Sequence, residues 1–107
     1  MPLPIFLTAR AQRDVDEAYE WWSSHRSAEQ AQRWRDRCVE AIDSLAANGA
    51  KCGPASENDS FPIELRQLAF GLGRRPSHRI LFNIRPEMVL VLRVQHLAQD
   101  RLSLEEF

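Results

Sequence analysis

The chain has 107 residues and a net charge of −1, with 44% hydrophobic and 27% charged residues. This length suits one domain with a modest core, and the composition argues against intrinsic disorder. The longest apolar run, residues 88–92, is far shorter than the roughly 18 residues of a membrane span, and no basic segment leads into an apolar one as in a secretory signal. We therefore expect a single cytoplasmic domain over residues 1–107 that makes no contact with a membrane.

Charge is unevenly distributed along the chain. Residues 1–62 carry seven Lys/Arg and ten Asp/Glu, a balance of −3, whereas residues 63–101 carry seven Arg and three Asp/Glu, a balance of +4. A basic C-terminal half is compatible with binding a polyanion or an acidic peptide. It is equally compatible with a solvated sheet face that carries ordinary arginines.

The cysteines indicate neither a metal site nor a disulfide framework. Cys38 and Cys52 share no metal-ligand spacing with each other or with the three histidines, and we interpret both as reduced thiols. Cys38, at helical spacing from Trp34 and Ile42, is expected to be a small buried apolar residue. We expect no metal and no cofactor.

The N-terminal half is predicted to form a strand and two helices. Residues 4–7 are a short apolar strand, and Thr8 is placed to cap a helix over residues 8–25. Apolar side chains recur on one stripe of this helix, and its carboxylates occupy the other faces. The stripe consists of Ala11, Val15, Ala18, Tyr19 and Trp22, and the carboxylates are Asp14, Asp16, Glu17 and Glu20.

The second helix is predicted over residues 27–48. Ser27 and Gln30 form a capping-box pattern at its start, and Asn48-Gly49 supply a stop at its end. The link between the two helices is very short, so they are expected to fold back as an antiparallel hairpin. The apolar stripe of this helix consists of Ala31, Trp34, Cys38, Ala41, Ile42 and Leu45.

The C-terminal half is predicted to form a sheet. Residues 51–62 are a loop rich in turn-forming residues, after which the apolar period changes from 3.6 to 2. Strands are expected over residues 63–68, 78–85 and 88–96, with a tight turn at 85–88 and a short helical tail at 100–107. The last strand is the most apolar and is expected in the middle of the sheet. The predicted fold class is α+β: an N-terminal strand, then an antiparallel helical hairpin packed on an antiparallel β-sheet.

Several segments together resemble the RelE/ParE toxin superfamily. Residues 65–68, 78–84 and 91–100 read LRQL, HRILFNI and VLRVQHLAQD, and the family has a strand of the form Arg-Ile-Leu-Tyr followed by a strand ending Val-x-His-x-x-Arg-Asp. The N-terminal half agrees, with Thr8-Ala9-x-Ala11 leading into an acidic helix. The sequence departs from the family at Phe82, where Tyr is frequent, and at Gln99, where Arg is frequent.

The resemblance implies the toxin of a type II toxin–antitoxin pair, silenced by a cognate antitoxin. ParE-like members of the superfamily poison DNA gyrase and have no recognised catalytic centre, whereas RelE-like members cut messenger RNA in the ribosome. The departures at Phe82 and Gln99 leave open a third alternative, a degenerate member that binds an antitoxin without being toxic.

An endoribonuclease would need cations on the phosphate and a proton donor or acceptor beside it. Arg66, Arg79 and Arg93 are candidate cations, His96 is a candidate base or acid, and Glu64 is the nearest carboxylate. His96, however, follows Leu90, Leu92 and Val94 on one predicted strand face and is expected to point into the core as a structural residue. The sequence pI of about 6.3 also differs from that of a strongly basic ribosome-binding nuclease.

We therefore expect a ParE-like toxin that acts by binding rather than by catalysis, without sequence-specific binding to DNA. An antitoxin segment is expected to lie between the helical hairpin and the sheet, with its acidic side chains against Arg79 and Arg93. Arg85 and the partly exposed Trp21 are further candidates for this interface.

Overall fold

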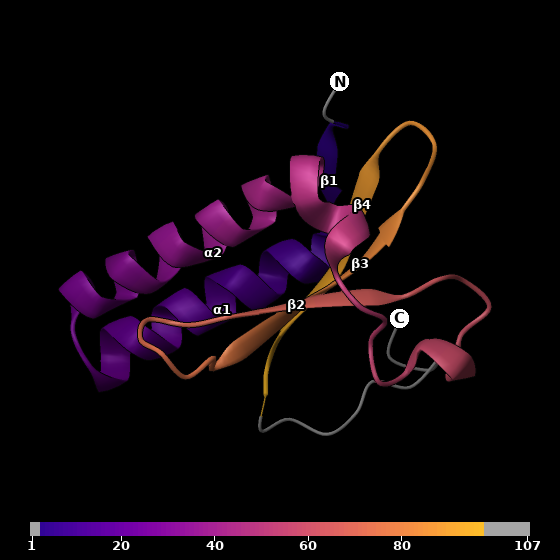
Figure 1. Cartoon of the computed structure of the whole chain (residues 1–107). Coiled ribbons are helices and arrows are strands. Elements are labelled where there is room, and N and C mark those ends of the chain that lie inside the picture. The colour runs from indigo at the N-terminus through magenta and orange to yellow at the C-terminus, as the bar shows by residue number, and fades with distance from the viewer. Residues whose placement is uncertain (1–2, 98–107) are drawn as a thin grey trace.

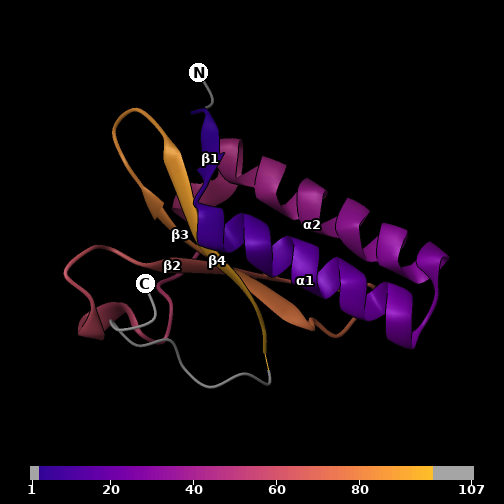
Figure 2. The same cartoon turned by 180° about the vertical axis from the view of Figure 1, so that it is seen from behind.

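The computed structural model describes residues 3–97 and has the predicted two-layer α+β fold. Two antiparallel helices lie side by side across one face of a four-stranded sheet (Figures 1 and 2). The expectations for the tail at residues 100–107 and for Gln99 lie outside the described residues. The elements are β1 Ile5–Leu7, α1 Ala9–His25, α2 Ala28–Asn48, β2 Arg66–Phe70, β3 His78–Ile84 and β4 Val89–His96, with 3-10 turns at Gly49–Lys51 and Asn58–Ser60. Within residues 3–97, neither helix is long and apolar enough to cross a membrane.

The strand order in the sheet is β1-β4-β3-β2. Strands β2, β3 and β4 form the predicted antiparallel meander, and the apolar β4 is paired on both sides, as expected from its composition. No local pattern indicates the partner of β1, which is only three residues long. It pairs parallel to β4, with Ile5 opposite Val89 and Leu7 opposite Val91.

Strand β2 begins later than predicted. It spans Arg66–Phe70 rather than residues 63–68. The reason is that Leu65 is hydrogen-bonded into the preceding loop: its N–H donates to Asn58 Oδ1 at 2.7 Å, and its carbonyl accepts from Ala55 N at 2.8 Å. The chain joins the ladder with β3 only after these two contacts.

Both predicted helix caps are present. The hydroxyl of Thr8 accepts from Ala11 N, and that of Ser27 accepts from Gln30 N, each at 3.0 Å. Helix α2 ends at Asn48 as predicted, but Gly49 has a φ of −55° and is not a left-handed terminator. A Cβ at Gly49 would lie 3.4 Å from the ring of Phe82, at van der Waals contact with the core.

The apolar residues form two clusters, one on each face of the sheet. The main core lies between the hairpin and the sheet and includes Trp34 and Phe82, both fully buried. Cys38 is also buried there as predicted, and burial raises the pKa of its thiol to about 12. The second cluster lies on the other face and includes residues of the loop that follows α2. Its buried members are Ala55, Phe61, Leu65, Leu81 and Leu92.

A β-bulge in β4 changes the face of the sheet toward which the side chains at the end of the strand point. Leu81 is paired with Arg93 while Phe82 is paired with Val91, so Leu92 is an extra residue without a partner in the register. Leu92 packs in the second cluster, whereas Val94 packs in the main core. The expectation that Leu90, Leu92 and Val94 share one face was therefore wrong, because a bulge breaks the alternation of the strand.

Thr8 connects the start of α1 to this bulge. Besides capping α1, its hydroxyl donates to the carbonyl of Leu92 at 3.0 Å, and its N–H donates to the carbonyl of Val91 at 3.0 Å. Within residues 3–97, the hydroxyl of Ser27 makes only the capping bond to α2. The two caps therefore differ by one long-range hydrogen bond.

We predict that Thr8→Ala lowers the free energy of unfolding by about 2 kcal/mol, against about 1 kcal/mol for Ser27→Ala. The difference reflects the loss of the bond to Leu92 in addition to the loss of the cap. Urea denaturation of the two variants and the parent measures it. An equal or smaller loss for Thr8→Ala would contradict a stabilising role of the bond to the bulge.

Candidate functional site

Arg66 and Glu64 form an exposed ion pair beside the start of β2. The Nε of Arg66 lies 2.5 Å from Glu64 Oε1, and its Nη1 donates to the carbonyls of Ala50 and Cys52 at 3.3 and 2.5 Å. The guanidinium thus ties β2 to the turn that follows α2. The candidate cation Arg66 and the candidate carboxylate Glu64 therefore bind each other, and Arg66 also binds the backbone.

Arg79 lies on the opposite face of the sheet, beneath the loop after α2, and only 8% of it is exposed. Its guanidinium forms a two-fold ion pair with the buried Glu57. It also donates to Gln67 Oε1 at 3.1 Å and to Gln95 Oε1 at 3.0 Å. Arg79 therefore holds the loop against the sheet.

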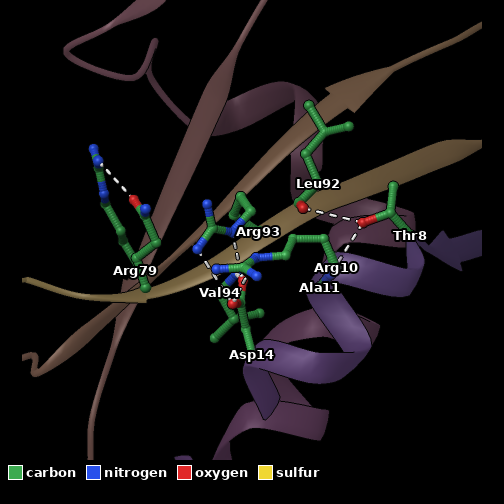
Figure 3. A network of polar contacts seen from close by, with 9 residues as sticks. Thr8, Arg10, Ala11, Asp14, Arg79, Leu92, Arg93 and Val94 are labelled. Carbon is green, nitrogen blue, oxygen red and sulfur yellow. Dashed lines mark hydrogen bonds and ion pairs between the residues drawn. The ribbon is translucent and has the colours of Figure 1, made fainter. Parts of the chain in front are cut away.

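Arg93 follows the bulge in β4, and its guanidinium reaches α1; the residue is only 5% exposed (Figure 3). Its Nε donates to Asp14 Oδ2 at 2.7 Å, and the backbone N–H of Val94 donates to the same oxygen at 3.0 Å. Arg10 approaches Asp14 Oδ1 at 3.6 Å from one turn earlier in α1. Asp14 was expected on a solvent face of its helix, but it is buried, because it faces the bulge in β4.

These positions correct the picture of a solvated basic sheet face. The guanidinium groups of Arg79 and Arg93 lie inside the protein, each paired with a carboxylate of another element. The predicted contacts of these arginines with an antitoxin stay predictions. Partner carboxylates would have to displace Glu57 and Asp14 to make them.

His96 is exposed at the end of β4, contrary to the expectation that it points into the core. It lies on the helix side of the sheet, with its ring centroid 5.0 Å from that of His78. The physical reason for its exposure is its position at the end of the strand, beyond the last buried core residue of β4, Val94.

His78 is the buried member of this pair of histidines. The indole N–H of Trp34 donates to its Nδ1 at 3.2 Å, and the hydroxyl of Ser77 lies 2.8 Å from the same nitrogen. Because the indole can only donate, Nδ1 is unprotonated and the ring proton is at Nε2. Burial, and secondarily His96, lowers the pKa of His78 to about 4, so the ring is neutral at physiological pH.

Four of the candidate nuclease residues, Glu64, Arg66, Arg79 and His96, do not come together as one site. Arg66 and Glu64 lie at one end of β2, and Arg79 lies on the far face. Position 70 of β2 is level with His78 and His96, so Arg66 is four residues away, about 13 Å along the strand. A phosphate at any one of these places would not be within reach of the others.

A pocket of about 430 Å³ lies between α1 and the end of β4. It brings together two of the predicted residues, His96 and Trp21, the latter 47% exposed. Arg85, a third candidate, is exposed in the turn between β3 and β4, at the opposite end of β4 from His96. The pocket is lined by Asp14, Glu17, Ala18, Trp21, Trp22, His78, Val94 and His96.

Sequence reasoning missed the pocket as a unit, although α1 contained a signal for it. Asp14, Glu17 and Trp21 are spaced by three and four residues, which places them on one helix face. That face also carries Ala18 and Trp22 from the apolar stripe. On this face Asp14 binds Arg93 of the sheet, and the two histidines line the same pocket.

Comparisons with known proteins identify a family and a fold. A family model described as "ParE toxin of type II toxin-antitoxin system, parDE" matches residues 5–101. A chain from the chromosomal ParDE toxin–antitoxin system of P. aeruginosa is similar in fold, with a TM-score of 0.70 and 19% identity, over 88% of this chain and 95% of that one. None of the curated proteins matches the chain.

Two further solved structures share the fold. A chain of the toxin–antitoxin complex RelBE2 from Mycobacterium tuberculosis has a TM-score of 0.56 and 19% identity, covering 90% of this chain and 99% of that one. The YoeB dimer from Staphylococcus aureus has a TM-score of 0.50 and 13% identity, covering 90% and 98%. At these identities the similarity concerns the fold.

We predict that the protein loses stability as the pH falls from about 6.5 to about 4. His78 has a lowered pKa in the folded state, so in this range the unfolded chain binds more protons and stability rises with pH. The contribution of His78 is complete above this range and amounts to about 3 kcal/mol. His78→Asn keeps an acceptor for Trp34 without the titration, so urea denaturation across the range should show a shallower slope. An unchanged slope would contradict the assignment.

We predict that Asp14→Asn lowers the free energy of unfolding by about 3–5 kcal/mol, because it leaves the buried guanidinium of Arg93 without a counter-charge. Asp43→Asn, which removes an exposed carboxylate from α2, serves as control and should cost less than about 0.5 kcal/mol. Thermal and urea unfolding measure both variants. A loss below 1 kcal/mol for Asp14→Asn would show that β4 holds its position without this carboxylate.

Proposed function

The chain belongs to the family of ParE toxins of type II toxin–antitoxin systems, and from this membership we propose that it inhibits DNA gyrase by binding to it. In this proposal the protein acts in the cytoplasm, needs no cofactor, and is silenced by its cognate antitoxin. The gyrase target follows from the family resemblance, and the mode of action follows from the positions of the candidate side chains.

The proposal that the protein acts by binding rests on one observation: the polar side chains that a nuclease would need at one phosphate lie apart. General acid–base cleavage of RNA requires the base, the acid and the cations to lie within hydrogen-bond reach of one phosphate. Here Arg79 and Arg93 are engaged by buried carboxylates, and Arg66 is engaged by Glu64 and two carbonyls. This favours inhibition by docking over RNA cleavage.

An antitoxin partner is supported by the structures with the same fold. The chain from P. aeruginosa comes from a ParDE toxin–antitoxin system, and the chain from M. tuberculosis comes from a toxin–antitoxin complex. For this chain we propose an antitoxin that contacts the helical hairpin and the sheet, with the exposed Trp21 and Arg85 as accessible contact residues. Arg79 and Arg93 support that surface from within.

We predict that induced expression of the protein relaxes plasmid DNA and leaves messenger RNA intact. The reason is that gyrase maintains negative supercoiling, whereas no described site joins the groups for RNA cleavage. Plasmid topoisomers and messenger-RNA integrity are measured in parallel on the same culture, and purified gyrase is assayed with the purified protein. Co-expression of the protein encoded beside the toxin should restore supercoiling.

The alternatives give different results in the same experiment. Cleaved messenger RNA with normal supercoiling would replace the proposal with a RelE-like endoribonuclease. Normal growth, normal supercoiling and intact messenger RNA, with the neighbouring protein still bound, would identify a degenerate, non-toxic member.

A further inference from the structure

The pocket between α1 and the end of β4 has a carboxylate that the fold does not use. Glu17 lines the pocket, is exposed, and forms no hydrogen bond or ion pair with the rest of residues 3–97. It lies one turn after Asp14 and one turn before Trp21, on the same face of α1. Its charge is therefore available to a group that enters the pocket.

Asp14, the other carboxylate in the pocket, is already neutralised. Its two oxygens accept from the guanidinium of Arg93 and the backbone of Val94, and Arg10 lies within ion-pair distance. An entering cation would gain little from Asp14, because that carboxylate has its counter-charges in place. Glu17 thus supplies the unpaired negative charge at the pocket.

The remaining walls suit a cation with a flat or apolar body. Trp21 and Trp22 contact each other edge to face, with ring centroids 5.5 Å apart, and His25 stacks on Trp21 at 4.7 Å. Indole faces attract guanidinium and ammonium groups, and guanidinium also stacks on planar rings. The chain uses this interaction elsewhere on α1, where Arg35 lies 5.6 Å from the ring centroid of Tyr19.

The size of the pocket is adequate for one long side chain. Its volume of about 430 Å³ lies at the lower end of the range of small-ligand sites. The imidazole of His78 in its floor is held by Trp34, with its proton at Nε2. A mixed lining of one free carboxylate, two indoles and two imidazoles matches a basic side chain better than a purely aliphatic or an acidic one.

We propose that this pocket receives an arginine side chain of the protein partner, with its guanidinium paired to Glu17 and stacked against Trp21 or Trp22. The inference rests on the proposed function, because it takes the toxin to act and to be silenced through protein partners. It adds the chemistry of one contact. The partner presents a cation here, opposite in sign to the acidic side chains expected against the sheet arginines.

The test measures binding of two short capped peptides to the purified protein, Ac-Ala-Arg-Ala-NH2 and Ac-Ala-Leu-Ala-NH2. The indole N–H signals of Trp21 and Trp22 in ¹H–¹⁵N spectra report on the pocket, and the buried Trp34 serves as an internal reference. Work at about pH 8 keeps imidazoles of ordinary pKa neutral. We expect the arginine peptide to shift the two pocket indoles and to bind more tightly than the leucine peptide.

Two variants of α1 that each remove one negative charge distinguish an effect at the pocket from a general electrostatic effect of the helix on peptide binding. Glu17→Gln should weaken binding of the arginine peptide about tenfold. Glu20→Gln removes an exposed carboxylate of the same helix that does not line the pocket, and it should leave binding unchanged. Added salt should weaken binding to the parent protein.

The inference is overturned if the leucine peptide binds as tightly as the arginine peptide, or if Glu17→Gln and Glu20→Gln bind the arginine peptide alike. An absence of any shift at Trp21 and Trp22 also overturns it. These results do not depend on gyrase. Normal supercoiling in the expression experiment would contradict the proposed function. A failed peptide titration together with relaxed plasmid DNA would contradict only the proposal of an arginine-binding pocket.

Discussion

The carboxylate of Asp14 sets the position of α1 on the sheet, because it is buried and, within residues 3–97, is bound by groups of the bulged part of β4 and by Arg10. The groups of β4 directly follow the bulge at Leu92: the guanidinium of Arg93 and the N–H of Val94 both reach the carboxylate of Asp14. Thr8 binds the carbonyl of the extra residue and starts α1 at the same place. Burying an ion pair costs desolvation energy, so we infer that its main contribution is to fix one register between helix and strand.

The arginines of the C-terminal half illustrate how a formal charge balance differs from a surface charge. The segment from residue 63 onward is basic in sequence, yet Arg66, Arg79 and Arg93 are each paired with a carboxylate, two of which come from the acidic N-terminal part. Within residues 3–97, the arginines of this half that form no ion pair are Arg74, Arg75 and Arg85, all exposed in turns. Two of the seven arginines of this segment are thus paired with carboxylates of the N-terminal part, and the charge balance gives little support for a polyanion-binding sheet.

Local sequence patterns were sufficient to predict the helices but not the buried polar contacts. The caps at Thr8 and Ser27, the apolar stripe around Trp34 and the central position of β4 follow from spacing and composition, which act over a few residues. The pairs Asp14–Arg93 and Trp34–His78 join residues 79 and 44 positions apart, and no local pattern indicates such partners. The bulge could not be predicted either, and strict alternation in β4 wrongly places Leu92 and Val94 on one face. The burial of Asp14 was missed for another reason: its partners in β4 are far away in the sequence.

The two carboxylates of the pocket show how one helix face can serve both folding and binding without conflict. Asp14 has its hydrogen-bonding capacity filled by Arg93 and Val94, so a change there acts first on the folded state. Glu17, one turn away, has no such contacts within residues 3–97, so a change there leaves the core and the bulge as they are. Because Glu17 lines the same pocket as Trp21 and Trp22, its carboxylate and the two indoles are together available to one entering cation.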